Sequence, residues 1–332
     1  MSQGLIPVTI LTGFLGSGKT TLLNHILKAD HGHRIAVIEN EFGEAGIDNE
    51  LLIQDRGEQI VEMNNGCICC TVRGDLVRIL GELVAKRKTG TLRFDRVVIE
   101  TTGLADPAPV AQTFFVDEEI SMHYLLDAIV TLVDAVHAPQ QMLEHHEAQE
   151  QVGFADRIVL TKTDLVSMND VLTLKARLMR MNPRAAITEA RFGQIDLQEV
   201  LDLRGFNLNA ILEIEPDFLT DVDHEHDDDV TSFVFRESQP LDLDRMEEFL
   251  GAIVQVYGPK LMRYKGILNI AGDPRRIVFQ GVHMLMGADH GAPWREGELR
   301  ESRMVFIGRD MPKDVLLQGL QQSVAKGDVV QA

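Results

Sequence analysis

Short apolar runs alternate with amphipathic segments along the first two thirds of the chain. Between the runs, apolar positions recur at helical spacing, as at Leu22, Leu23, Ile26 and Leu27. Continuous apolar strands that alternate with helices are typical of a mainly parallel sheet covered by helices on both faces. The sequence therefore predicts an α/β domain whose strands include residues 8–11, 35–38, 97–99, 128–133 and 157–160.

This alternation fades after about Leu212, where an acidic stretch that contains His224 and His226 begins. We interpret residues 213–230 as a linker between a first domain, 1–212, and a second, 231–332. The His/Asp-rich part could relay metal or could be only a solvated linker. The second domain is expected to be a smaller α+β unit with two amphipathic helices and strands near residues 231–235, 268–271, 277–282 and 304–307.

Composition narrows the class of protein. Acidic residues outnumber basic ones 51 to 32, and the formal charge of −19 opposes binding to nucleic acid. No apolar run approaches the roughly 20 residues that span a bilayer, and the amino terminus has no basic region typical of a signal peptide. Three cysteines packed into one pentapeptide suit a reducing compartment. We therefore expect a cytoplasmic protein that binds neither nucleic acid nor membrane.

The strongest motif is GFLGSGKT at positions 13–20, which fits the phosphate-binding P-loop between a predicted strand and a predicted helix. Its glycines let backbone N–H groups close around phosphates. Lys19 is expected to reach the β and γ phosphates, and Thr20 to hold Mg²⁺. The predicted nucleotide-binding positions are Gly13, Gly16, Ser17, Gly18, Lys19, Thr20 and Thr21.

A second motif, Thr161-Lys162-Thr163-Asp164, follows the strand at 157–160. The Asp164 carboxylate can accept hydrogen bonds from guanine N1–H and N2–H₂, which adenine does not offer. Lys162 would lie along the plane of the base, and Thr161 and Asp164 complete the predicted site. GTP is therefore preferred over ATP as the nucleotide.

Between these motifs, the strand at 97–99 ends in Glu100-Thr101-Thr102-Gly103. In a parallel sheet this strand end faces the ligand crevice beside the P-loop. Glu100 could hold the Mg²⁺ shell or a water molecule, and Gly103 could bring a backbone N–H to the γ-phosphate. We therefore expect Lys19, Thr20 and Glu100 to act in catalysis.

The three cysteines, Cys67, Cys69 and Cys70, lie on a predicted strand-to-helix loop. Clustered thiolates suit Zn²⁺ or Cu(I), and a helix amino terminus lowers thiol pKa values. Buried structural thiols or a redox pair are alternatives. Because strand ends gather at one edge of the sheet, Glu39 or Glu44 could complete a metal site with them. The same two residues lie where a nucleotide-responsive switch is expected.

Five motifs in this order and spacing give the chain a resemblance to the CobW/YjiA-type P-loop GTPases: GFLGSGKTT at 13–21, ENEFGE at 39–44, GCICC at 66–70, ETTG at 100–103 and TKTD at 161–164. The resemblance implies a slow GTPase that binds Zn²⁺, or another transition metal such as Co²⁺ or Ni²⁺, at the cysteines with Glu39 and Glu44. It also implies delivery to a client metalloprotein and a nucleotide- or metal-linked homodimer. RYKG at 263–266 looks like part of the family's second domain.

These observations leave three hypotheses. The leading one is a GTP-dependent metallochaperone in which nucleotide state changes metal affinity. A second is a metal sensor or buffer with a GTPase timer, and a third is an ATP-dependent P-loop kinase, which Asp164 argues against.

Overall fold

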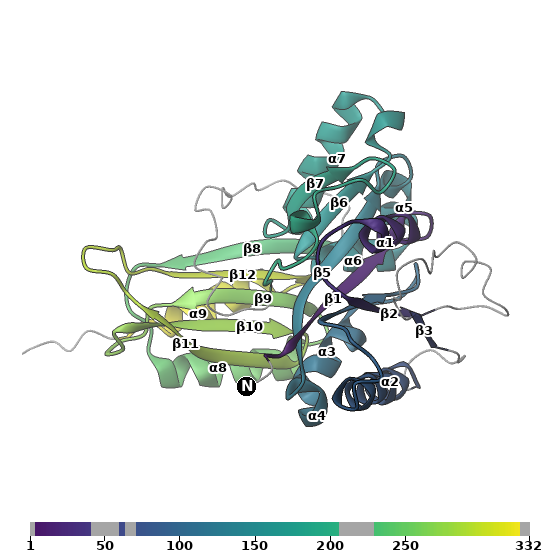
Figure 1. The fold of residues 1–332 in the computed structure, drawn as a ribbon. Helices are drawn as coiled ribbons and strands as arrows, with labels where there is room; N and C mark the ends of the chain where they lie inside the picture. The colour runs from purple at the N-terminus through teal and green to yellow at the C-terminus, as the bar shows by residue number, and fades with distance from the viewer. Residues whose placement is uncertain (1–3, 41–59, 64–70, 206–228, 326–332) are drawn as a thin grey trace, which may run out of the picture. The chain divides into compact units, whose positions relative to one another are not determined.

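The computed structural model describes residues 4–40, 60–63, 71–205 and 229–325 (Figure 1). The chain divides into two compact units, Met1–Met179 with Ala185–Phe206, and Arg180–Arg184 with Asn207–Ala332. Residues 206–228 lie outside the described part of the chain, so the predicted domain limits at 212 and 230 stay predictions.

A parallel sheet forms the centre of the first unit. Its spatial order is β3-β2-β4-β1-β5-β6-β7, and all neighbouring strands run parallel. The predicted α/β architecture is confirmed. The strands are β1 (Ile6–Gly13), β2 (Ile35–Asn40), β3 (Ile60–Met63), β4 (Arg96–Glu100), β5 (Tyr124–Asp134), β6 (Arg157–Thr161) and β7 (Ala186–Ala190).

Helices cover both faces of this sheet. Leu22, Leu23, Ile26 and Leu27 of α1 pack on one face with the segment that holds Val200. Because crossovers between parallel strands are right-handed, the strand order places α2, α3, α6 and α7 on the other face. The helices are α1 (Lys19–Lys28), α2 (Thr71–Lys88), α3 (Ala108–Val116), α4 (Glu118–Ser121), α5 (Ala138–Glu144), α6 (His146–Phe154) and α7 (Met168–Met181), with short 3₁₀ turns η2 (Thr163–Leu165) and η3 (Leu197–Glu199).

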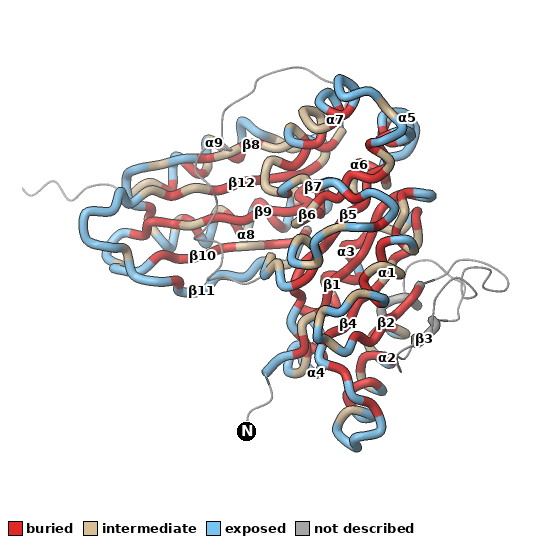
Figure 2. Tube along the Cα trace, turned by 45° about the horizontal axis from the view of Figure 1, so that its top comes forward, coloured by how far each residue is buried: buried red, intermediate tan, exposed pale blue. Residues whose placement is uncertain are grey.

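The central strands are buried because each is covered by helices on both sides (Figure 2). In β4, for example, Val97 and Val98 are fully enclosed, and in β6 the same holds for Ile158 and Val159. Such strands need continuous apolar sequence, which explains why the runs in the sequence predicted them. The loops at the carboxyl ends of the strands are thereby left to carry the polar motifs.

The second unit is an antiparallel sheet with two helices on one face, as the predicted α+β class requires. Its strand order is β11-β10-β9-β12-β8. The core is built from Phe233, Phe279 and Phe306 of the sheet together with Leu250 of α8 and Leu316 of α9. The elements are β8 (Val230–Glu237), α8 (Leu243–Tyr257), β9 (Leu261–Leu268), β10 (Arg275–Val282), β11 (Leu285–Pro293), β12 (Ser302–Arg309) and α9 (Lys313–Gln322).

One predicted strand of this unit was misplaced and another was missed. The strand expected near 268–271 is β9, Leu261–Leu268, where Arg263 and Lys265 interrupt the apolar pattern although both are buried. β11 is exposed along most of its length and therefore lacks an apolar run. The Tyr264 ring lies over Gly281, where an added Cβ would come within 2.0 Å of the ring. The pairing of Tyr264 with Gly281 between β9 and β10 leaves no pattern in the sequence and is seen only in the folded sheet.

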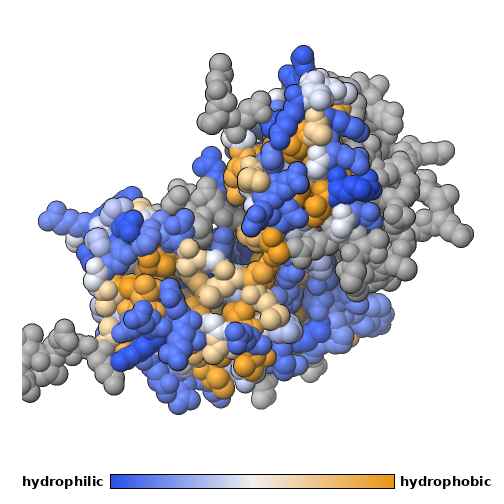
Figure 3. Space-filling model, turned by 90° about the horizontal axis from the view of Figure 1, so that it is seen from below, coloured by the Kyte–Doolittle hydropathy of each residue, from blue (hydrophilic) through white to orange (hydrophobic). Residues whose placement is uncertain are grey.

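Apolar side chains gather on the face of the second unit seen in Figure 3. Exposed large apolar residues of the second unit include Leu243 and Val256 of α8, Met284 and Met286 around the start of β11, and Val315 of α9. Within the described ranges, none of the helices is long and apolar enough to cross a membrane.

Candidate functional site

The P-loop joins β1 to α1 and has a backbone that requires glycine. Gly13, Gly16 and Gly18 have φ values of 141°, 74° and 96°, a region that side chains with a Cβ rarely adopt. A Cβ on Gly13 would also come within 2.4 Å of the Leu132 carbonyl oxygen. Gly18 is the N-cap residue of α1 and provides no side-chain hydrogen bond, so the helix amino terminus keeps N–H groups for an anion.

Lys19 is buried at the start of α1 and turns back onto the loop. Its Nζ donates hydrogen bonds to the carbonyl oxygens of Gly13 and Phe14, at 2.8 and 3.2 Å. Within the described residues, the buried Ser17 Oγ has no hydrogen-bond partner, and a buried hydroxyl without a partner is costly. The glycine cradle, the ammonium group and this hydroxyl fit the phosphates of a nucleotide.

Thr20 and Glu100 meet beside the P-loop. The Thr20 Oγ1 donates to Glu100 Oε1 at 3.2 Å, which joins the first turn of α1 to the end of β4. A hydroxyl and a carboxylate are oxygen ligands of the kind that Mg²⁺ prefers. These two residues fit the predicted magnesium site.

The loop after β4 packs closely against the P-loop. A Cβ on Gly103 would lie 2.7 Å from the backbone N of Leu15, so only glycine allows this approach. The buried Gln151 of α6 donates to the carbonyl oxygens of Gly103 and Ala105, at 3.1 and 3.0 Å. The sequence analysis did not identify Gln151, because a single glutamine in a helix carries no motif.

The predicted guanine-binding segment is tied to the P-loop by two of its side chains. Thr161 Oγ1 donates to the Ser17 carbonyl oxygen at 2.8 Å. Lys162 adopts φ 57°, and its Nζ donates to the Gly16 carbonyl oxygen at 2.9 Å. Asp164 is exposed at the edge of the sheet, where its carboxylate is open to a ligand.

Asp134, the last residue of β5, anchors Lys162. Its carboxylate is 1% exposed and accepts a hydrogen bond from Lys162 Nζ at 2.7 Å. It also accepts one from the Val136 backbone N–H at 2.9 Å, and His137 Nδ1 lies 2.8 Å away. Burial raises the pKa of Asp134, but the hydrogen bonds from Lys162, His137 and Val136 outweigh burial and hold the pKa below its usual value. The sequence analysis missed Asp134, although its position directly after an apolar strand was a usable signal.

Glu189 holds the 3₁₀ turn that carries Asp164. It accepts hydrogen bonds from Thr163 Oγ1 at 3.0 Å and from Lys175 Nζ at 2.7 Å. The bond from Lys175 is the main reason why the pKa of Glu189 is lowered. β7 and α7 therefore both fix the loop between β6 and α7.

Among the residues predicted to bind Zn²⁺ or a similar transition metal, the structure describes Glu39, which is buried near the end of β2. The backbone of Glu39 is in register with Glu100 of β4 and with Glu62 of β3. Cys67, Cys69, Cys70 and Glu44 lie outside the described residues. In the ranges that are described, no group of three or more His, Cys, Asp or Glu residues could hold a metal ion.

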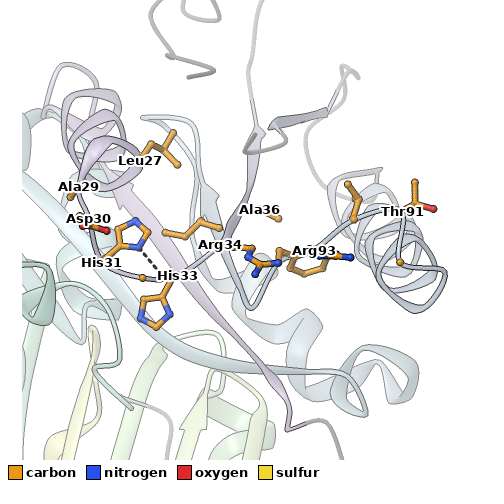
Figure 4. A pocket seen from close by; sticks show the side chains of 14 residues that line it. Leu27, Ala29, Asp30, His31, His33, Arg34, Ala36, Thr91 and Arg93 are labelled. Carbon is orange, nitrogen blue, oxygen red and sulfur yellow. Dashed lines mark hydrogen bonds between the residues drawn. The ribbon is translucent and has the colours of Figure 1, made fainter. Parts of the chain in front are cut away.

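A cavity of about 500 Å³ lies where α1 ends and β2 begins (Figure 4). Because the strands are parallel, the start of β2 lies at the opposite edge of the sheet from the P-loop, which follows the end of β1. The stacked rings of His31 and His33 line it, and Arg34 and Arg93 also contribute. Burial lowers the pKa of His31. The cavity contains none of the predicted site residues. The predicted residues that the structure brings together lie at the P-loop, and we therefore take that edge of the sheet as the candidate site.

The chain matches two family models, described as CobW/HypB/UreG, nucleotide-binding domain, over residues 7–189, and as Cobalamin synthesis protein cobW C-terminal domain, over residues 230–324. The Zinc chaperone YjiA of Escherichia coli is 46% identical over 93% of this chain and 96% of the relative. The Zinc-regulated GTPase metalloprotein activator 1 of Schizosaccharomyces pombe is 31% identical over 95% and 82%. The crystal structure of Zn(II)-bound YjiA GTPase from E. coli matches with a TM-score of 0.81 and 38% identity, covering 97% of this chain and 100% of that chain.

Proposed function

The chain belongs to the CobW/HypB/UreG family and is a GTPase, and we propose that it is a zinc chaperone whose metal affinity is set by bound nucleotide. Zn²⁺ would bind at Cys67, Cys69 and Cys70 with Glu39 and Glu44, and would be passed to a client metalloprotein. The zinc named for its relatives favours this metal over Co²⁺ or Ni²⁺.

The observation that carries this proposal is the alignment of three strand ends. Glu39, a proposed zinc ligand, is the register neighbour of Glu100, and Glu100 accepts a hydrogen bond from Thr20 of the P-loop. β3, which leads toward the cysteines, pairs with β2 on its other side. Loss of the γ-phosphate could therefore shift Glu100 through Thr20, and through the adjacent strand could shift the proposed zinc ligand Glu39.

The nucleotide half of the proposal assigns roles to residues around the P-loop. Lys19 would exchange its two carbonyl partners for phosphate oxygens, where its charge offsets the charge that develops during hydrolysis. Thr20 and Glu100 would hold Mg²⁺, which when bound supplies positive charge to the phosphates. Gly103, held by Gln151, would offer its backbone N–H to the γ-phosphate.

Coupling requires that Zn²⁺ binds with different affinity in different nucleotide states, because only that difference can drive delivery. Zinc titration of the full chain with a GTP analogue, with GDP and without nucleotide measures it directly. Cys67→Ser and Glu39→Gln should weaken zinc binding, whereas Glu82→Gln on the exposed side of α2 is a matched control. Equal zinc affinity in all three states would refute the proposal.

Delivery and assembly need separate measurements. The zinc-loaded chain, mixed with an apo client, should transfer metal faster with GTP than with GDP. Zinc binding without any transfer would instead favour a sensor or buffer. The proposal includes a homodimer linked to nucleotide or metal, which sedimentation with and without each ligand would test.

A further inference from the structure

The chain makes a tight turn directly after β7. Arg191 and Gln194 exchange backbone hydrogen bonds, with N–O distances of 3.3 and 2.9 Å. The two residues between them, Phe192 and Gly193, have φ values of 53° and 75°. Positive φ at both central positions defines a type I′ turn, in which asparagine, aspartate or glycine is the usual first residue. A phenylalanine there adopts an unfavourable backbone conformation.

This turn lies at the nucleotide edge of the sheet. A Cβ on Gly193 would come within 2.7 Å of the Thr21 carbonyl oxygen, so the turn packs against the first turn of the P-loop helix. On the preceding strand, Ala190 is in register with Thr161, and Glu189 accepts a hydrogen bond from Thr163. The turn is therefore joined both to α1 and to the segment that carries Asp164.

The Phe192 side chain is 85% exposed, the largest value for a large apolar side chain in the described part of the chain. Packing in the core therefore does not explain why a phenylalanine occupies this position. Its positive φ is unfavourable for a side chain with a Cβ. Exposed aromatic rings beside nucleotide sites offer a flat face on which a base can stack.

We propose that Phe192 stacks on the guanine base of the bound nucleotide while Asp164 reads the edge of that base. This inference rests on the proposed role of residues 161–164 in guanine binding. Stacking contributes affinity that does not depend on the hydrogen-bonding edge of the base. Phe192 therefore supplies base affinity, and Asp164 supplies the preference for guanine.

Calorimetric titration of the full chain with GDP and Mg²⁺ tests the proposal. Phe192→Ala should weaken GDP binding by about tenfold or more, whereas Phe192→Tyr should keep it within about twofold because the ring remains. Met122→Ala removes another exposed apolar side chain, 66% exposed and near the start of β5, and should have no effect. Pyrophosphate, which lacks a base, should bind the parent and Phe192→Ala equally.

A spectroscopic signature separates stacking from a structural role. The chain has one tryptophan, Trp294, so Phe192→Trp combined with Trp294→Phe puts the only indole at the proposed platform. GDP should quench its fluorescence and pyrophosphate should not. Absence of quenching by saturating GDP, or unchanged GDP affinity in Phe192→Ala, would overturn the inference.

Asp164→Asn distinguishes this inference from the function on which it rests. If Asp164→Asn loses GDP affinity but Phe192→Ala does not, the stacking inference is refuted and the proposed role of residues 161–164 in guanine binding stands. If neither variant changes GDP affinity, the proposed guanine segment itself is wrong.

Discussion

Lys162 connects three parts of the nucleotide site, and removing its charge tests how the site is held together. Its Nζ donates to the Gly16 carbonyl oxygen in the P-loop and to Asp134 at the end of β5. Lys162→Met keeps most of the side-chain volume but removes both hydrogen bonds. The Asp134 side chain is 1% exposed, so in the variant its charge would stay buried without the Lys162 ammonium group. Its carboxylate would keep only the hydrogen bonds with His137 and with the Val136 N–H.

The size of the effect follows from the geometry of this pair. A hydrogen bond to a charged group contributes about 1.5–3 kcal/mol. Because the Lys162 side chain is 35% exposed, solvent screening favours the lower half of that range, about 1.5–2 kcal/mol. We expect Lys162→Met to lower the free energy of unfolding of the first unit by this amount at neutral pH.

The pH dependence of the loss has a definite sign. The folded-state pKa of Asp134 is lowered from 3.8, so its charged form contributes stability above pH 3.8, and this contribution disappears as pH falls through the lowered pKa. Without Lys162, the effect of burial, which raises the pKa, gains weight. The stability difference between parent and variant should therefore shrink as the pH falls below 3.8 and through the lowered pKa of Asp134.

Hydrogen exchange of peptides that span β5 and β6, measured by mass spectrometry and corrected for intrinsic rates, reports on the first unit alone. Tryptophan fluorescence would not, because Trp294 belongs to the second unit. A double-mutant cycle with Asp134→Asn should give a coupling energy of about 1–2 kcal/mol, and Lys86→Met, at an exposed position of α2, is the control. A coupling energy near zero, or a loss that stays the same from pH 7.5 to well below pH 3.8, would refute the reasoning.

Three further predictions concern single positions. Thr20→Val should lower the Mg²⁺-dependent GTPase rate by at least about tenfold, with Thr20→Ser retaining most of it, as a phosphate-release assay would reveal. Gly103→Ala should cost about 1–3 kcal/mol and weaken nucleotide binding, because its Cβ would lie 2.7 Å from the Leu15 backbone N; unchanged GDP affinity would contradict this. Gly281→Ala, whose Cβ would meet the Tyr264 ring at 2.0 Å, should destabilise the second unit by a similar amount in urea denaturation followed by tryptophan fluorescence, without changing GTP affinity.

The sequence by itself determined the first unit's architecture and the nucleotide motifs. Buried parallel strands require unbroken apolar runs, and the phosphate loop requires glycine at fixed positions such as Gly13 and Gly18. Both are local constraints, so each leaves a pattern that can be recognised without knowing what lies across the sheet. The position of β9 was predicted wrongly because Arg263 and Lys265 interrupt its apolar pattern, although both are buried.

Tertiary structure decided which side chains support those motifs. Asp134 reaches Lys162 from a strand 28 positions earlier in the chain, and Gln151 reaches Gly103 across 48 positions. The alignment of Glu39 with Glu100 depends on the order of the strands in the sheet, which brings distant segments side by side. Likewise, only the tertiary structure places Phe192 beside the nucleotide site, because its turn packs against Thr21. Such pairings leave no local periodicity in the sequence, because the contact is made by the fold and not by neighbours along the chain.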